Sequence, residues 1–273
     1  MFKNLKTFIL SFSIAVSFLF PVLSYGAEEQ QPLEDDSFTF VQITDLHFGI
    51  KGNLENAPKI IKSVNSLPME VQFVAVTGDV FHDNIDDEKM VDRAASVFEK
   101  LKPQAYFIPG NHDLHPKNFS EERAVFENKF GPLCVRKEIK NVVMLFIYLE
   151  PLRKNSESKN YNPFEVLEEN LKQCGTKPVI IFTHSPPVLD FHENEMYYVW
   201  DKENMAKLLK ILASYNVKAM VTGHLHRNEL HWEAELPMYV SEPVSNQFGR
   251  QPAYRIYEYK KGKLSYTTQY LER

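Results

Sequence analysis

Residues 38–49 read FTFVQITDLHFG, a strand-like run that ends abruptly in a polar cluster containing Asp45 and His47. The predicted strand covers residues 38–44. Short apolar runs recur along the chain, at residues 71–77, 104–108, 142–148, 179–183 and 219–222. Runs of this kind are typical of strands that are buried on both faces of a sheet.

Segments with helical spacing of apolar residues lie between the predicted strands. A period of about 3.6 residues predicts helices at residues 55–66, 86–101, 120–130, 163–173 and 202–215. The alternation of strands and helices indicates an α/β fold with a layered sheet.

The C-terminal third has a different pattern. From Asn228 onward the sequence becomes strand-like, with the segments NELHWEAEL, PMYVSE, AYRIYEYK and KLSYTTQY. Lys261 and Gly262 form a plausible hairpin turn between the last two segments. We expect these strands to form a second, more antiparallel sheet. The sequence has no internal repeat, low-complexity tract or linker, so residues 38–273 are predicted to form one domain.

The N-terminus has the pattern of a secretory signal peptide. Two lysines precede an apolar, uncharged run at residues 7–20, and small residues then mark a cleavage site before Ala27. A membrane anchor is the alternative, but it needs about 20 apolar residues, so no stable anchor is expected. Residues 1–26 are therefore predicted to be removed and residues 27–37 to form a flexible leader. The expected location is periplasmic or secreted.

Composition excludes some classes of protein. The chain has 273 residues, of which 44% are hydrophobic and 13% aromatic, which suits a globular domain and argues against disorder. The formal charge of -5 becomes -7 without the signal peptide, because that segment contains Lys3 and Lys6 and no acidic residue. Long nucleic acids need a basic surface, so none is expected as a partner.

The two cysteines leave two interpretations open. Cys134 and Cys174 could form a disulfide in an oxidising compartment. They could equally be two buried free thiols, since the sequence alone does not set the geometry that a disulfide requires.

Polar clusters follow five of the predicted strands. They are Thr44-Asp45-Leu46-His47, Thr77-Gly78-Asp79, Pro109-Gly110-Asn111-His112-Asp113, His184, and Gly223-His224-Leu225-His226. The carboxyl ends of strands in an α/β sheet lie along one edge, where ligands bind. We therefore expect these distant segments to meet in space.

The residue types in these clusters are those of a metal site. Carboxylates, imidazoles and amide oxygens bind manganese, iron or zinc, and the absence of a thiolate argues against a structural zinc finger. Asp45 and His47 are spaced so that both can face one metal, whereas His224 and His226 can reach two adjacent metals. Asp79 has two carboxylate oxygens and could bridge the pair. Each motif alone occurs often by chance, but all five in this order do not.

The full set resembles the calcineurin-like metallophosphoesterase superfamily over residues 38–242. The resemblance implies a four-layer αββα sandwich of two mixed sheets flanked by helices, with the active site at the carboxyl ends of the strands. It also implies two divalent or trivalent metal ions of manganese, iron or zinc. The implied ligands are Asp45, His47, Asp79 and His226 for the first metal, and Asp79, Asn111, His184 and His224 for the second. His112 would protonate the leaving group, oriented by Asp113.

This chemistry predicts a phosphoesterase in which a metal-activated hydroxide attacks phosphorus. Together with the N-terminal pattern, it predicts that the phosphoesterase is exported. The expected substrate is a small phosphodiester or a nucleotide. A broad-specificity phosphomonoesterase is the alternative. A metal-binding interaction protein without catalytic activity is a third hypothesis, against which the intact His112-Asp113 pair argues.

Three other histidines are candidates for substrate contact. His82 stands where purple acid phosphatases carry a tyrosine, so no purple colour is expected, and the string G-D-V-F-H is similar to that of DNA-repair nucleases of the superfamily. A loop or surface histidine is the alternative for His82. His115 and His192, together with Asp83, are further candidates, and ordinary solvated side chains are their alternative.

Overall fold

The structure is a computed structural model that describes residues 36–192 and 194–272. The predicted signal peptide, residues 1–26, and most of the predicted leader, residues 27–37, lie outside the described residues. None of the helices in the described part of the chain has both the length and the apolar character needed to cross a bilayer.

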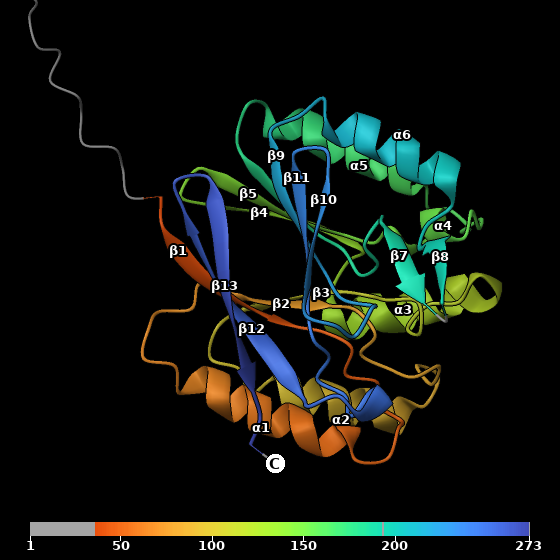
Figure 1. Ribbon diagram of the computed structural model, residues 1–273. Coiled ribbons are helices and arrows are strands. Elements are labelled where there is room, and N and C mark those ends of the chain that lie inside the picture. Colours follow the sequence, from red (N-terminus) through yellow and green to blue (C-terminus); the bar gives the residue numbers. More distant parts are fainter. Residues whose placement is uncertain (1–35, 193, 273) are drawn as a thin grey trace, which may run out of the picture. The chain divides into compact units, whose positions relative to one another are not determined.

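The first sheet has five strands in the order β13-β12-β1-β2-β3 (Figure 1). Their bounds are Phe38–Ile43 for β1, Val74–Thr77 for β2, Ala105–Ile108 for β3, Ala253–Lys260 for β12 and Lys263–Tyr270 for β13. Strands β1, β2 and β3 are parallel, while β12 pairs antiparallel with both β1 and β13. The sheet is therefore mixed, and its parallel part supplies three of the predicted polar clusters.

The second sheet has six strands in the order β10-β11-β9-β6-β5-β4. Their bounds are Cys134–Ile139 for β4, Val142–Ile147 for β5, Val179–Phe182 for β6, Val217–Thr222 for β9, Glu229–Glu233 for β10 and Leu236–Val240 for β11. The four inner strands are parallel, and the two edge strands are antiparallel to their neighbours. A separate hairpin is formed by β7, Leu189–His192, and β8, Glu195–Tyr198.

Helices cover the outer faces of the two sheets. The helices are α1 (Asn53–Asn65), α2 (Glu88–Phe98), α3 (Phe119–Phe130), α4 (Glu150–Arg153), α5 (Pro163–Cys174) and α6 (Lys202–Leu212), with short 3₁₀ turns η1 (Pro116–Asn118) and η2 (Gln247–Gly249). Figure 1 shows α1 and α2 outside the first sheet, and α5 and α6 outside the second. This is the four-layer sandwich that the family resemblance implied.

Aromatic side chains from both sheets fill the space between them. Phe40 of β1 stacks on Phe73 at a centroid distance of 4.9 Å, and Phe146 of β5 stacks on Phe182 of β6 at 4.5 Å. The two pairs meet edge to face, with Phe40 and Phe182 at 5.4 Å. Tilted and offset aromatic contacts of this kind stabilise a core beyond the area that they bury. They fix how the two sheets, and hence the loops at their ends, lie against each other.

The C-terminal strands correct one prediction. They do not form a sheet of their own, because β10 and β11 extend the second sheet while β12 and β13 extend the first. Alternation along a strand shows which face is buried but not which neighbour it pairs with. The predicted hairpin turn is confirmed, since Lys260 pairs with Lys263 and the turn residues Lys261 and Gly262 have φ of 50° and 76°.

The cysteines are two free thiols in this structure. Cys174 is buried at the end of α5, and its Sγ donates to the carbonyl of Asn170 at 3.1 Å. Burial raises the pKa of the Cys134 thiol to about 11. Of the two interpretations left open by the sequence, the structure agrees with two free thiols, of which Cys174 is buried and Cys134 is partly buried.

Candidate metal centre

The segments after β1, β2 and β9 share an unusual backbone. Asp45, His47, Asp79, His224 and His226 all have positive φ, between 48° and 69°. Residues other than glycine adopt this left-handed conformation at a cost of roughly 1–2 kcal/mol each, and it persists only where the surrounding structure imposes it. Such residues gather at functional sites, so their concentration here marks this sheet edge as the candidate site.

Hydrogen bonds between the loops impose this conformation. The Asp45 amide donates to the Gly78 carbonyl at 3.0 Å, and the His47 amide donates to the Asp79 carbonyl at 2.9 Å. The loops also approach so closely that side chains are excluded at Gly110, where a Cβ would collide with the Asp79 carboxylate. The site is therefore a rigid assembly of backbone segments rather than a set of independent loops.

A first cluster contains Asp45, His47 and His226. One potential ligand atom from each lies within 4.8 Å of the others, and all three residues are buried. His226 Nε2 is 3.2 Å from Asp45 Oδ1 and 3.1 Å from His47 Nε2. Three donor atoms that converge from two loops form a geometry that can hold one metal ion.

A second cluster contains Asp79, His184 and His224, again with ligand atoms within 4.8 Å of one another. His184 Nε2 is 3.0 Å from Asp79 Oδ2. The other ring nitrogen of His184, Nδ1, is 2.8 Å from the Thr77 carbonyl, to which it donates. That bond fixes the tautomer and directs Nε2 into the cluster, as is usual for histidines that bind metals.

The two clusters adjoin. His47 Nε2 of the first is 3.7 Å from Asp79 Oδ2 of the second, and His184 Nε2 is 4.0 Å from Asp45 Oδ1. The His224 amide donates to the Asp45 carboxylate at 3.1 Å. The structure thus confirms that the strand-end segments meet, and it places Asp79 between the two groups.

Polar atoms in the site fit a bound metal. The buried Asn111 Oδ1 is without a hydrogen-bond partner among the described residues. Leaving such an atom unsatisfied costs about 1–3 kcal/mol, and an amide oxygen is a type of atom that binds manganese, iron or zinc. The donor set of carboxylate, imidazole and amide oxygen therefore fits the two metal ions that the sequence predicts.

Charge in the site also suits metal ions. Burial disfavours the ionised Asp45, but His226 and His184 outweigh burial and lower its pKa to about 2. Burial lowers the pKa of His47 to about 4, so this imidazole stays neutral and able to bind metal. His184 behaves differently, because Asp79 and Asp45 overcome burial and raise its pKa to about 10. The two buried carboxylates leave excess negative charge in the site, and a proton on His184 balances part of it. Bound cations would balance this charge instead.

His112 lies at the rim of these clusters. Its amide donates to Asp79 Oδ1 at 2.9 Å, and its ring centroid is 5.1 Å from that of His47. Its Nδ1 is 2.8 Å from Asp83 Oδ1. Asp83 is therefore the carboxylate that orients His112, a role that the sequence analysis gave to Asp113.

The expected contact between Asp113 and His112 is wrong. The Asp113 carboxylate is fully buried and accepts from the amides of Val80, Phe81 and Gly110, at 3.2, 2.7 and 2.8 Å. Burial, with the nearby charge of Asp79, raises its pKa to about 7. Asp113 braces the loops after β2 and β3 instead of contacting the proposed acid.

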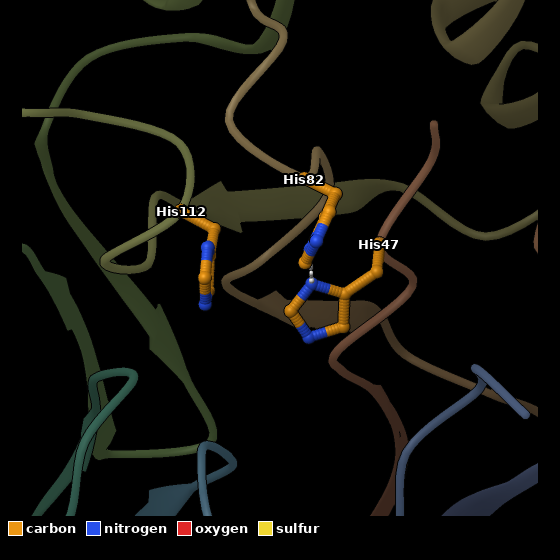
Figure 2. A group of neighbouring side chains, drawn as sticks. All are labelled: His47, His82 and His112. Carbon is orange, nitrogen blue, oxygen red and sulfur yellow. Dashed lines mark hydrogen bonds between the residues drawn. The ribbon is translucent and has the colours of Figure 1, made fainter. Parts of the chain in front are cut away.

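His82 lies within the site. Its Nδ1 is 3.3 Å from His47 Nδ1, and its ring stacks on His112 at a centroid distance of 5.0 Å (Figure 2). Potential ligand atoms of His47, His82 and His112 also lie within 4.8 Å of one another. His82 is thus a partly buried loop residue in the wall that carries the proposed acid, and its contact with substrate stays a prediction.

His115 lies one step further out. Its Nε2 is 2.8 Å from Asp83 Oδ1, and its Nδ1 is 3.0 Å from Glu122 Oε1. Burial disfavours its charged form, but the hydrogen bonds to Asp83 and Glu122 outweigh burial and raise the pKa of His115. The contacts give His115 a role in holding Asp83. Glu122 was missed because nothing in its sequence context distinguishes it from other helix surface residues.

His192 lies on the exposed hairpin β7–β8, with its ring 6.2 Å from that of Tyr197. The hairpin is tied to the site by Arg227, which follows His226 and lies 2.6 Å from Asp190 of β7. A substrate contact by His192 stays a prediction.

A comparison with known protein families shows the family of this chain. The family model for calcineurin-like phosphoesterases matches residues 38–228. The chain belongs to the calcineurin-like phosphoesterase family.

Its curated relatives in this family include phosphatases and phosphodiesterases. The chain is 25% identical over 210 residues to the human serine/threonine-protein phosphatase CPPED1, covering 70% of this chain and 65% of that protein. It is 28% identical over 212 residues to a probable glycerophosphodiester phosphodiesterase GpdQ of Arcobacter nitrofigilis, covering 68% and 71%. It is 24% identical over 208 residues to the 3',5'-cyclic adenosine monophosphate phosphodiesterase CpdA of Haemophilus influenzae, covering 68% and 69%.

Solved structures share the fold at low identity. A dimetal phosphatase from Danio rerio superposes with a TM-score of 0.58 at 14% identity, covering 85% of this chain and 98% of that one. A purple acid phosphatase from yellow lupin gives 0.58 at 12% identity, covering 84% and 51%. These matches confirm the fold class that was predicted for this chain.

Proposed function

We propose that the protein is a phosphoric ester hydrolase that works with two metal ions. The observation that carries the proposal is that the two clusters meet at Asp79. The chain that holds them belongs to a family of phosphoesterases. The proposed ligands are Asp45, His47, Asp79 and His226 for one ion, and Asp79, Asn111, His184 and His224 for the other.

The chain's own residues contribute positioning and a proton. Metal ions bound there would neutralise phosphate charge and activate the attacking water. The left-handed backbone at Asp45 and Asp79 holds the carboxylates in place before substrate arrives. Preorganised charge of this kind lowers a barrier because it needs no rearrangement during the reaction.

His112 is the proposed acid for the leaving group. Its Nδ1 donates to Asp83, which leaves Nε2 as the nitrogen that can face the substrate. An acid for the leaving group must present its N–H to the leaving oxygen, and the contact with Asp83 orients the ring for that. This pair also argues against a protein that merely binds metal.

A small phosphodiester or nucleotide is the proposed substrate class, supported by similarity to GpdQ and CpdA. A broad-specificity phosphomonoesterase is the second candidate, supported by similarity to CPPED1.

One assay separates the diesterase from the monoesterase. Purified protein, loaded with Mn²⁺ or treated with a chelator, is given p-nitrophenyl phosphate or bis-p-nitrophenyl phosphate.

We expect hydrolysis only with metal, and faster hydrolysis of the diester. A preference for the monoester would favour the second candidate. Metal binding without hydrolysis of either ester or of nucleotides would overturn the enzymatic proposal. Asp79→Asn serves as the matched variant, because it keeps the side-chain shape while removing the negative charge that lies between the two clusters.

We further propose that the protein is exported. The proposal rests on the apolar run at residues 7–20 and its small-residue cleavage pattern. N-terminal sequencing of the protein purified from cells that express the full chain is the test. A mature N-terminus at Ala27 is expected, and a chain that retains Lys3 and Lys6 would contradict export by cleavage.

A further inference from the structure

Phe248 is an exposed aromatic residue at the edge of the metal centre. Its side chain is 83% exposed, more than any other large apolar side chain of the described residues. Its ring contacts His226 at a centroid distance of 5.4 Å. Because an exposed ring gains little from burial, packing does not explain a phenylalanine at this position.

The backbone does not favour a phenylalanine either. Phe248 has φ of 54° and ψ of 28°, the left-handed region that glycine and asparagine adopt more easily. Strained residues of this kind tend to lie where the side chain has a function. Exposure and strain are therefore two independent reasons to look for a role of this ring.

The loop that carries Phe248 is fastened to the site. The Val244 amide donates to the Thr44 carbonyl at 2.9 Å, and the Ser245 amide donates to the Asp45 carbonyl at 3.0 Å. The Asn246 amide donates to Asn53 Oδ1 at 3.1 Å. These bonds join the loop to the segment after β1 and to the first residue of α1, so the ring is held beside the first metal cluster.

A series of ring contacts links Phe248 to the proposed acid. His112 contacts His47 at 5.1 Å, His47 contacts His226 at 5.1 Å, and His226 contacts Phe248 at 5.4 Å. His112 and Phe248 are thus at the two ends of this series. If His112 protonates the leaving oxygen, the substituent near Phe248 is the one that stays on phosphorus.

We propose that Phe248 forms a stacking subsite for a planar aromatic group on the retained substituent, with a nucleobase as its ligand. This inference rests on the proposed function and narrows it to phosphodiesters that keep a nucleoside on phosphorus. Every base has a flat face that can stack on an aromatic ring, so the subsite selects nucleosides without selecting one base. A phosphomonoester has a single substituent, which is the leaving group when it is hydrolysed, so turnover of a monoester does not use the subsite.

Two diesters with the same leaving group test the subsite. Thymidine 5'-(p-nitrophenyl phosphate) retains a nucleoside, and ethyl p-nitrophenyl phosphate retains an alkyl group, while both release p-nitrophenolate. Stacking of a base is worth roughly 5- to 150-fold in affinity, and for an exposed ring we expect about 5- to 30-fold. Phe248→Ala should raise KM for the thymidine ester by this factor and leave kcat and the ethyl ester nearly unchanged.

Further variants separate a flat ring from mere bulk. Phe248→Trp should keep the preference for the thymidine ester, and Phe248→Leu should lose it. Trp232→Ala is the matched control, because Trp232 of β10 is also exposed, at 59%, and should change neither ester. Equal losses on both esters would show that Phe248 acts through His226, and no loss on either would also overturn the subsite.

A binding measurement distinguishes failure of this inference from failure of the proposed activity. Calorimetry compares thymidine 5'-monophosphate with ethyl phosphate on Mn²⁺-loaded protein, with and without Phe248→Ala. If the wild type hydrolyses neither diester, the diesterase proposal fails, yet a selective loss of thymidine monophosphate binding would still support the subsite. Unchanged binding of both phosphates would refute it.

Discussion

Asp83→Asn is the most informative change outside the proposed metal ligands. One carboxylate oxygen of Asp83 lies 2.8 Å from both His112 Nδ1 and His115 Nε2. Asp83 has φ of 57°, a conformation that asparagine tolerates, so the substitution removes charge without straining the backbone further. It therefore isolates the effect of the carboxylate on the proposed acid.

The size of the effect follows from the contact and its exposure. A hydrogen bond to a charged group contributes about 1.5–3 kcal/mol. Because 51% of the Asp83 side chain is exposed, water screens the interaction. We therefore expect the contact with His112 to contribute about 1–2 kcal/mol to catalysis. This corresponds to a loss of about 5- to 30-fold in kcat/KM for a substrate whose leaving oxygen needs a proton.

The assay compares leaving groups. p-Nitrophenolate departs without protonation, so Asp83→Asn should barely slow bis-p-nitrophenyl phosphate, whereas a dialkyl phosphodiester should be slowed by the full factor. Asp86→Asn, at an exposed position three residues further along, is the control. An equal loss on both substrates would refute the reasoning, because it would show that Asp83 supports the site as a whole.

Three other changes test the site. Asp113→Ala removes the acceptor of three buried amides and should lower the free energy of unfolding by about 2–4 kcal/mol in urea titrations; unchanged stability would contradict the bracing role. Gly110→Ala places a Cβ against the Asp79 carboxylate and should weaken Mn²⁺ binding by about 10- to 100-fold in calorimetry, whereas native affinity would show that the loops can separate. Saturating Mn²⁺ should raise the melting temperature by roughly 5–10 °C over chelated protein, since only the folded state has the assembled site; equal melting temperatures would argue against two buried ions.

The sequence predicted the metal clusters because their signal is local. Each cluster follows a short apolar run, and parallel strands bring their carboxyl ends to one edge whatever the intervening helices do. The segments that carry Asp79, His184 and His224 could therefore be expected to meet, and the family resemblance implied that these residues share one metal. The strand that precedes Asp79 begins at Val74, three residues later than predicted, and this difference does not move the site.

Other features depend on side-chain direction and strand partners, which sequence patterns do not contain. Asp113 is next to His112 in the chain, yet its carboxylate turns inward to backbone amides, and the more distant Asp83 takes the expected place. The C-terminal strands were identified but assigned to one sheet, because alternation does not choose a partner. Phe248 gave no signal, since its importance lies in exposure and backbone conformation.

Anomalous diffraction from crystals of Mn²⁺-loaded protein tests the central claim most directly. We expect two neighbouring peaks, one among Asp45, His47 and His226 and the other among His184, His224 and Asn111, with Asp79 in contact with both. A single peak, or a peak enclosed by His47, His82 and His112 alone, would contradict the two-metal centre.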